Sequence, residues 1–424
     1  MGRTLIDKGI DWVGLVPENW YFQKGKYLFR QRNDRGNKIE LQLLSPTQKF
    51  GCIPQSVYEE LTGANTVKLN DKTDLNLLKT IHKGDFCISL RSFQGGFEYS
   101  NYEGVVSPAY QVFYPIHNNV YRGYYKYIFK DGAFIDKMNS FTLSLRDGKN
   151  IAFDDFGNTL IPLPPFEEQK AIANFLDNKT VEIDKAINEA QELIDKYKVF
   201  KQSIIYEAVT KGLNSNVAMK DSGLPWIGEI PSNWRCLRGK YSLEYLQKPT
   251  YDSDGVITCF RDGEVTLRSN RREEGFTISE KEIGYQGIDV GDLVVHGMDG
   301  FAGSIGISDS RGKASPVLVV LDSKENKRYL MYYLRNLAYR DVFLALATGI
   351  RVRSCDLRWN KLAETVLVLP PLNEQDNIVS FLDKKLAEID KVVSQKEKLI
   401  TQLQEYKKSI IFEYVTGKKE VPNG

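Results

Sequence analysis

Two long stretches of the chain carry the same pattern of apolar positions. Residues 163–210 and 369–416 align without a gap, and about half of their positions are identical. In each stretch the apolar residues recur in alternating steps of three and four, which is typical of a long helix with a coiled-coil seam. The predicted seam comprises Leu176, Ile183, Ile187 and Ile194 in the first stretch and Leu382, Ile389, Val393, Ile400 and Leu403 in the second.

Local signals predict where these helices begin and end. Each stretch starts with a Pro-Pro pair, which suits the entrance of a helix and not its interior. Gly212 and Gly417 follow the last apolar positions and are plausible helix stops. A single helix of this kind would expose its stripe to water. We therefore expect the two helices to pack together in antiparallel fashion; the alternative is that each packs on its own globular segment or on another chain.

A shorter motif frames the same repeat. GIDWVGLVPENW at 9–20 matches GLPWIGEIPSNW at 223–234, and we name these two segments the Trp motifs. Between the Trp motifs and the helices the two halves have diverged, and only Gly84-Asp85 with Gly291-Asp292 and Ser107-Pro108 with Ser315-Pro316 correspond.

This order predicts an α+β protein with a pseudo-twofold internal repeat. The expected parts are two α/β domains at 1–162 and 213–368, and two helical regions at 163–212 and 369–424. A length of 424 residues agrees with more than one hydrophobic core.

Composition narrows the function classes. The net charge of +2 argues weakly against nonspecific coating of nucleic acid. The five cysteines form no C-x-x-C pair, so we expect reduced thiols and neither a disulfide framework nor a zinc site. No apolar run reaches the ~18 residues that a membrane helix needs, and the N-terminus lacks a secretory pattern. The expected location is the cytoplasm.

Catalytic motifs are not found. Leu163-Pro164-Pro165-Phe166 superficially resembles an amino-methyltransferase motif, but Leu163 has no side-chain oxygen for the target amino group. The stretch from Gly306 to Ala314 misses the spacing and the Ser/Thr of a phosphate-binding loop. His82, His117 and His296 are isolated in the sequence, which gives no support for a metal or acid–base cluster. We predict a chain without catalytic activity of its own.

The repeated pattern L-P-P-x-x-E-Q…F-L-D…E-I-D-K…S-I-I-x-E-x-V-T, with the two Trp motifs, resembles the DNA-specificity subunits of type I restriction–modification systems. The resemblance covers the whole chain. It implies that 1–162 and 213–368 are target-recognition domains that each read half of a bipartite, asymmetric DNA site. It also implies that the helices set the spacer length and dock two methyltransferase subunits.

The resemblance further implies that S-adenosylmethionine, ATP and Mg²⁺ belong to partner methyltransferase and restriction subunits, with no cofactor or metal in this chain. Three alternatives remain open. They are a recognition subunit of a related methyltransferase-only system, a coiled-coil scaffold without base reading, and a self-sufficient methyltransferase or nuclease.

Candidate DNA contacts follow from donor-rich stretches. The basic segment with Lys24, Lys26, Arg30 and Arg32 has two interpretations. Either it contacts DNA phosphates, or it is the solvated face of an amphipathic helix. Polar loops after apolar strands are candidates for base reading, and the alternative is that they are ordinary turns. The candidate residues are Arg91, Ser92 and Gln94 in the first half and His296 and Asp299 in the second. Arg146, Lys149, Arg351 and Arg353 precede the helices and suit guanine or phosphate, or pair within their domain.

Overall fold

The computed structural model describes residues 3–36, 41–64, 74–89, 96–141, 151–271, 282–345 and 357–422. The chain divides into two compact units. Unit 1 comprises residues 1–190 and 398–424, and unit 2 comprises residues 191–397. The predicted division placed boundaries at 162/163, 212/213 and 368/369, at the ends of the long helices, whereas the boundary between the compact units falls inside both helices.

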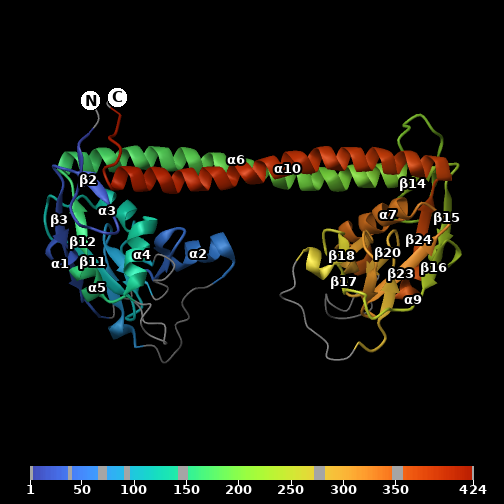
Figure 1. Cartoon of the computed structure of the whole chain (residues 1–424), viewed down its shortest axis with the longest axis horizontal. Helices are drawn as coiled ribbons and strands as arrows, with labels where there is room; N and C mark the ends of the chain where they lie inside the picture. The colour runs from blue at the N-terminus through green and yellow to red at the C-terminus, as the bar shows by residue number, and fades with distance from the viewer. Residues whose placement is uncertain are drawn as a thin grey trace. The chain divides into compact units, whose positions relative to one another are not determined.

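The two predicted helices are present with the predicted ends. Helix α6 spans Phe166–Lys211 and α10 spans Leu372–Val415 (Figure 1). Each begins directly after its Pro-Pro pair, and Gly212 and Gly417 follow with φ of +78° and +71°. These left-handed conformations favour glycine, which explains why a glycine ends each helix.

Within unit 1 the two helices run antiparallel. The ring centroids of Phe175 and Tyr414 are 4.4 Å apart, and Lys407 Nζ lies 2.6 Å from Asp184 further along the pair. In unit 2, Lys201 makes an ion pair with Asp390 of α10. Lys201 and Lys407 interrupt the apolar stripe in the sequence, and each reaches an aspartate on the opposite helix.

Unit 1 is built from short antiparallel strands. Its first part contains β1 (Leu5–Asp7), β2 (Leu15–Pro17), β3 (Tyr21–Lys24), α1 (Gly25–Leu28), β4 (Phe29–Arg32), β5 (Leu44–Thr47), β6 (Gly51–Pro54), α2 (Gln55–Thr62), η1 (Leu75–Leu77) and β7 (Lys79–Ile81). There follow β8 (Phe86–Ile88), β9 (Phe97–Tyr99), β10 (Gly104–Val106), β11 (Gln111–Pro115), α3 (Arg122–Ile128), α4 (Gly132–Ser140), α5 (Phe153–Asn158) and β12 (Leu160–Leu163).

Unit 2 contains β13 (Met219–Asp221), β14 (Glu229–Pro231), β15 (Arg235–Arg238), η3 (Gly239–Tyr241), β16 (Leu243–Leu246), β17 (Ile257–Cys259), β18 (Val265–Leu267), η4 (Arg268–Asn270), β19 (Gln286–Ile288) and β20 (Leu293–His296). There follow η5 (Gly300–Ala302), β21 (Ile305–Ile307), β22 (Gly312–Ala314), β23 (Leu318–Ser323), α7 (Lys327–Tyr339), α8 (Val342–Ala345), α9 (Trp359–Glu364) and β24 (Val366–Leu369).

The two units share one topology although their sequences have diverged. The central sheet has the order β4-β11-β8-β9 in unit 1 and β16-β23-β20-β21 in unit 2. The smaller pairs also correspond: β1-β2 with β13-β14, β3-β12 with β15-β24, β5-β6 with β17-β18, and β7-β10 with β19-β22. The predicted α+β duplication therefore extends through the divergent segments as well.

The cores are filled differently. In unit 1, Phe29 on β4 packs against Phe86, Phe113 and Phe129 with ring centroids 5.6 to 6.0 Å apart. The corresponding strands of unit 2 bury aliphatic residues such as Leu243 and Leu293. Apolar volume at these positions is enough to keep the topology, because cores tolerate changes that conserve volume and pattern.

The Trp motif joins the start of one long helix to the end of the other within each unit. In unit 1, the buried Trp20 donates from Nε1 to Glu168 of α6 at 3.1 Å. Lys418, just after α10, donates from Nζ to the carbonyl of Val13 at 2.6 Å. A Cβ on Gly417 would lie 2.5 Å from Pro17. We name this set of contacts the clasp.

Unit 2 has an equivalent clasp at the end of α6 and the start of α10. Lys211 donates to the carbonyl of Glu229 in the second Trp motif. A Cβ on Gly212 would lie 3.2 Å from the ring of the buried Trp234 and 3.0 Å from Glu374 of α10. The Trp and Gly residues thus lie in equivalent places in the two units, although Nε1 of Trp234, unlike that of Trp20, has no hydrogen-bond partner among the described residues.

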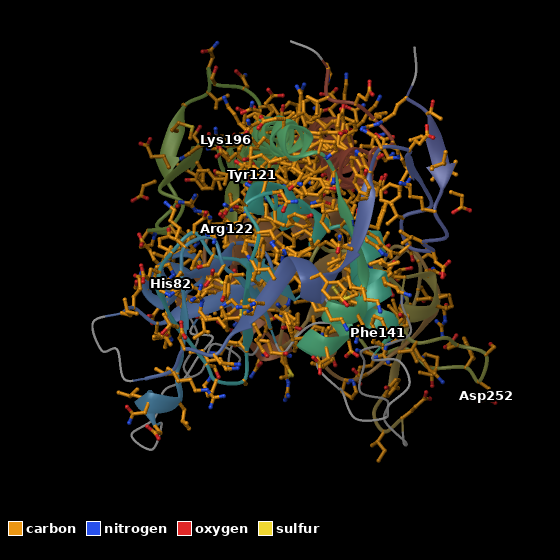
Figure 2. All side chains as sticks on the ribbon, turned by 90° about the vertical axis from the view of Figure 1, so that its left-hand side faces the viewer. His82, Tyr121, Arg122, Phe141, Lys196 and Asp252 are labelled. Carbon is orange, nitrogen blue, oxygen red and sulfur yellow. The ribbon has the colours of Figure 1, made fainter. Side chains whose placement is uncertain are left out.

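The retained Gly-Asp pair is structural too. In unit 1 the buried Asp85 accepts hydrogen bonds from Arg32 at 2.8 Å and from the backbone of His82 at 3.0 Å. Arg122 covers this turn and donates to the carbonyl of Lys83; Figure 2 shows Arg122 and His82 on the same face.

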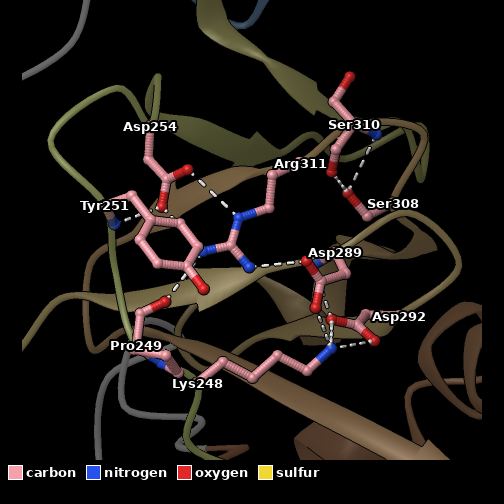
Figure 3. A network of polar contacts seen from close by, with 9 residues as sticks. All are labelled: Lys248, Pro249, Tyr251, Asp254, Asp289, Asp292, Ser308, Ser310 and Arg311. Atoms are coloured by element: carbon pink, nitrogen blue, oxygen red, sulfur yellow. Dashed lines mark hydrogen bonds and ion pairs between the residues drawn. The ribbon is translucent and has the colours of Figure 1, made fainter.

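In unit 2 the matching carboxylate is Asp292, which pairs with Lys248 at 2.6 Å. Figure 3 shows that Asp289 links this pair to Arg311, whose guanidinium also binds Asp254. Because a buried carboxylate without a partner is costly, the cation at this position stabilises the folded unit.

Candidate nucleic-acid interface

Part of the predicted DNA-contact set lies outside the described residues. These are Arg91, Ser92, Gln94, Arg146, Lys149, Arg351 and Arg353. The remaining six candidates lie in two places, one in each unit.

The basic segment of unit 1 is not a helix face, as one interpretation held. It forms β3, the single turn α1 and β4, because Gly25 allows a tight approach to the carbonyl of Phe156. Lys24, Lys26 and Arg30 are exposed there. Lys26 and Arg30 line a hollow of about 700 Å³ together with Gln23, Tyr27, Leu28, Ile116, His117, Asn119 and Leu163.

Arg32 differs from its basic neighbours. Its side chain is 18% exposed, pairs with Asp85 and Asp34, and stacks on the ring of Tyr114 at 4.4 Å. Burial disfavours its charged form, but the hydrogen bonds to Asp85 prevail and raise its pKa above the usual value. Arg32 is therefore engaged in the fold, and Lys24, Lys26 and Arg30 are the cations of this segment that face solvent.

Unit 2 brings His296 and Asp299 to a second hollow, of about 740 Å³. The other polar lining residues come from the β17–β18 hairpin, η4 and the loops beside β20 and β23. They are Thr258, Arg261, Asp262, Arg268, Arg271, Ser304 and Ser315. We name this depression the arginine hollow.

Each arginine of the hollow is held by a polar partner. Arg261 pairs with Asp299 at 3.0 Å, and Arg268 donates to Thr258 at 2.9 Å. Arg271 pairs with Asp262 at 2.6 Å and lies over the ring of Phe260 at 4.2 Å. Partly exposed ion pairs of this kind contribute little to stability. Their arginines can exchange a carboxylate for a phosphate or a guanine edge at small cost.

Neutral groups in the arginine hollow add further hydrogen-bonding capacity. Nδ1 of His296 accepts from the backbone N–H groups of Asp299 at 3.0 Å and Met298 at 3.3 Å. Burial lowers the pKa of His296, so its ring is neutral at pH 7 with the proton on Nε2. Ser304 Oγ is buried and has no hydrogen-bond partner among the described residues. An unsatisfied buried hydroxyl beside a hollow is a place where a ligand atom would be stabilised.

Sequence reasoning identified His296 and Asp299 because they follow a buried strand. It missed Arg261, Arg268 and Arg271, although the spacing of arginines along 261–271 was visible. No contiguous motif joins that hairpin to the His296 loop; only packing in three dimensions brings them together.

The central sheet of unit 1 buries polar groups at Cys87 and Glu98, where the equivalent positions of unit 2 are Val294 and Gly306. Glu98 on β9 is 1% exposed and pairs with Lys130 at 2.6 Å. Burial raises the pKa of Glu98 to about 7, although Lys130 opposes this shift. Cys52 and Cys87 are buried nearby, and burial raises the thiol pKa of Cys52. The two units therefore present different side chains on one topology.

The predicted seam residues are all buried or half-buried. Leu176, Ile183, Ile194, Leu382 and Ile389 are buried, and Ile187, Val393, Ile400 and Leu403 are half-buried. Leu176, Ile183, Ile187 and Leu403 pack in the core of unit 1, and Leu382 packs in the core of unit 2. Exposed apolar side chains on these helices include Val181, Val199, Phe200 and Tyr406.

Two further observations bear on function class. No group of three or more His, Cys, Asp or Glu residues in the described ranges is arranged to hold a metal ion. Among the described helices, none is both long and apolar enough to cross a membrane.

Comparison with known families gives one consistent result. The model of the type I restriction modification DNA specificity domain matches residues 23–193. The type I restriction enzyme MjaVIII specificity subunit of Methanocaldococcus jannaschii is 26% identical over 304 residues, which cover 67% of this chain and 68% of that protein.

Two other curated relatives match over less of their own length. The putative type I restriction enzyme MjaX specificity subunit of the same organism is 26% identical over 62% of this chain and 59% of that protein. The type I restriction enzyme StySPI specificity subunit of Salmonella potsdam is 21% identical over 63% of this chain and 59% of that protein.

Solved structures share the fold. A chain from a study of complex assembly and conformational transition of the type I R-M system matches with a TM-score of 0.68 at 15% identity, covering 95% of this chain and 99% of that chain. The HsdS subunit from Thermoanaerobacter tengcongensis matches with a TM-score of 0.53, also at 15% identity, covering 95% and 98%.

Proposed function

We propose that the chain, which resembles type I restriction–modification specificity subunits in sequence and in fold, is the DNA-reading subunit of such a complex and has no catalytic activity of its own. Each unit reads one half of a bipartite, asymmetric site. Methylation and cleavage, with S-adenosylmethionine, ATP and Mg²⁺, are the work of methyltransferase and restriction subunits.

One observation carries this proposal: the two units have the same strand order, but equivalent hairpins carry different side chains, with Arg261 and Asp262 between β17 and β18 where unit 1 has Gln48 and Lys49 between β5 and β6. A protein that reads two unlike half-sites needs one scaffold and two sets of donors and acceptors. The arginine hollow supplies guanidinium groups for guanine edges and phosphates, hydroxyls, and the neutral His296 ring.

The long helices have a separate role in the proposal. They fix the separation of the two readers and thereby the length of the unread spacer. The methyltransferase subunits dock partly on the exposed apolar residues of α6 and α10, such as Val199 and Phe200. Contiguous apolar patches on a protein surface mark partner-binding sites, and Val199 and Phe200 are adjacent exposed apolar residues of α6.

The test uses methylome sequencing of a host that carries this chain with its methyltransferase subunit. Arg261→Ala removes a 65%-exposed arginine that is paired at 3.0 Å in the arginine hollow. Its matched control is Arg235→Ala, which removes a 57%-exposed arginine paired with Glu325 at 3.1 Å outside the hollow. We expect R261A to relax or change the half-site read by unit 2, with a loss of roughly 10- to 100-fold in affinity, and to leave the other half-site intact.

R235A should leave both half-sites intact. Equal effects of the two variants, or a change in the half-site read by unit 1, would argue against the hollow as a reader. Retention of DNA by the purified complex should also fall by orders of magnitude between ~50 and ~200 mM salt, because phosphate contacts release counterions. A flat salt response, or no sequence preference in the wild type, would favour the scaffold alternative.

A further inference from the structure

The two units share one exposed feature that folding does not explain. Gly25-Lys26-Tyr27 in unit 1 recurs as Gly239-Lys240-Tyr241 in unit 2, at the same turn between the same strands. The tyrosines are 55% and 71% exposed. We name these two turns the Lys-Tyr turns.

Other residues retained between the divergent segments have structural roles. The aspartates of the Gly-Asp pairs are buried and bind a cation, as described above. The backbone carbonyls of the two serines of the Ser-Pro pairs close equivalent turns. They accept hydrogen bonds from the backbone N–H groups of Tyr110 at 3.1 Å and Leu318 at 3.0 Å. Gly25 and Gly239 are required because a Cβ would collide with the carbonyls of Phe156 and Leu362.

The lysine of each turn is held in place by the neighbouring helix. Lys26 donates to Asn158 at 3.1 Å, and Lys240 pairs with Glu364 at 2.8 Å. Each ammonium group also lies over the ring of the adjoining tyrosine, at 5.7 Å and 5.6 Å. The ring is thereby orientated, yet more than half of it remains in water in both units. Nothing in either unit's packing requires an aromatic residue there.

The Lys-Tyr turns lie away from the proposed reading surface. In Figure 1, α1 lies on the opposite side of unit 1 from α2, which follows the β5–β6 hairpin. Likewise β15 and β16, which flank the second turn, lie on the opposite side of unit 2 from β17 and β18 of the arginine hollow. A surface that reads unlike half-sites is expected to differ between the units, whereas this one is the same.

We propose that the Lys-Tyr turns are equivalent docking points for two copies of one protein, the methyltransferase subunit of the proposed complex. This inference rests on the proposed function. Identical surfaces on two units fit a partner that is present twice. Rigid tyrosines with an apolar ring and a polar tip are frequent centres of protein interfaces. The flanking cations, Lys24 and Arg238 at the preceding position, suit a partner surface with carboxylates around an apolar patch. Lys26 then belongs to this surface and not to the DNA contacts expected from the sequence.

The experiment compares tyrosine variants of the full chain with its methyltransferase subunit by native mass spectrometry and titration. Tyr27→Ser and Tyr241→Ser are tested singly and together. Tyr21→Ser is the matched control, because Tyr21 is 73% exposed and its counterpart is Arg235, so its aromatic ring is not repeated. Each single variant should weaken binding of one of two methyltransferase copies by roughly 10- to 100-fold, and the double variant should weaken both.

Y21S should assemble like the wild type, and all variants should keep the wild-type melting temperature because the side chains are exposed. Assembly of Y27S/Y241S equal to that of Y21S would overturn the docking surface alone. The docking surface would also be overturned if Y27S/Y241S assembled normally but bound every DNA sequence more weakly and with a smaller dependence of affinity on salt. That result would identify the turns as phosphate contacts. A wild-type chain that takes no methyltransferase subunit would overturn this inference and the proposed function together.

Discussion

The clasp of unit 1 makes a strong prediction about one glycine. Gly417 has φ of +71°, and a Cβ there would lie 2.5 Å from Pro17 and 2.8 Å from the ring of Trp20. Gly417→Ala therefore imposes two penalties. A left-handed conformation costs a non-glycine residue about 1 kcal/mol. Forcing a methyl group into a packed contact costs about 1 to 3 kcal/mol more.

Two other glycines separate these terms. Gly63 follows α2 with φ of +68°, and a Cβ there would meet nothing within 4 Å. Gly63→Ala should thus show the conformational penalty alone, about 1 kcal/mol. Gly212→Ala should fall between the two, because its nearest neighbour is the movable carboxylate of Glu374 at 3.0 Å. For Gly417→Ala we expect about 2 to 4 kcal/mol in total.

Hydrogen exchange followed by mass spectrometry measures this loss of stability segment by segment, without assuming that a two-unit chain unfolds in one step. In G417A, amides of residues 9–20 and of the end of α10 should exchange roughly 30- to 1000-fold faster, while unit 2 is unchanged. In G63A, only amides around the end of α2 should change, by about 10-fold or less. Both variants place a side chain in a left-handed conformation, but only G417A also forces it against Pro17 and Trp20. Equal losses of protection in the two variants would therefore refute a contribution from packing.

Three further predictions concern charge and length. The pKa of Glu98 is raised from 4.5 to about 7 in the folded state. The wild type should therefore lose up to about 3 kcal/mol of stability as pH rises from 4.5 to 7, and Glu98→Gln should lack this loss. If the difference in urea midpoint between the two proteins does not vary with pH, the raised pKa of Glu98 is contradicted. Asp85→Ala leaves Arg32 half-buried without its main partner and should cost about 3 to 5 kcal/mol, whereas Asp34→Ala, at the exposed end of the same network, should cost under about 1 kcal/mol in the same urea titration. Insertion of four residues within 183–197 should change the spacer in methylome sequencing and leave the half-sites unchanged; altered half-sites with the same spacer would exclude the ruler role.

The helices could be predicted because their signals are local. Steps of three and four along 46 residues of α6 and 44 residues of α10 outweigh any single exception. The exceptions themselves carried information that only the structure supplies. Lys201 and Lys407 weaken the seam as written in the sequence, yet each meets an aspartate of the opposite helix.

The divergent segments could not be predicted to the same degree. Most of their strands have three or four residues, too few for an alternation of apolar and polar positions to stand out. The site was predicted in part for the same reason. His296 ends β20 after three consecutive apolar residues and Asp299 follows it, whereas Arg261 and Arg271 reach them through the pairing of β17 with β18. The basic segment from Lys24 to Arg32 looked like one surface, but burial of Arg32 against Asp85 divides it.

The uneven divergence of the two halves follows from where each residue acts. Trp20, Glu168 and Gly417 meet in one clasp, so a change in any of them disturbs contacts between a Trp motif and both long helices. Arg261 and Asp299 contact each other at the wall of an open hollow, and a change there disturbs little else. The residues of the clasp are constrained because each has several partners from distant parts of the chain. The proposed reading surface is free to vary because its residues have few such partners. The Lys-Tyr turns fit neither rule, being exposed and yet repeated, and this is the physical reason to look for their partner outside the chain.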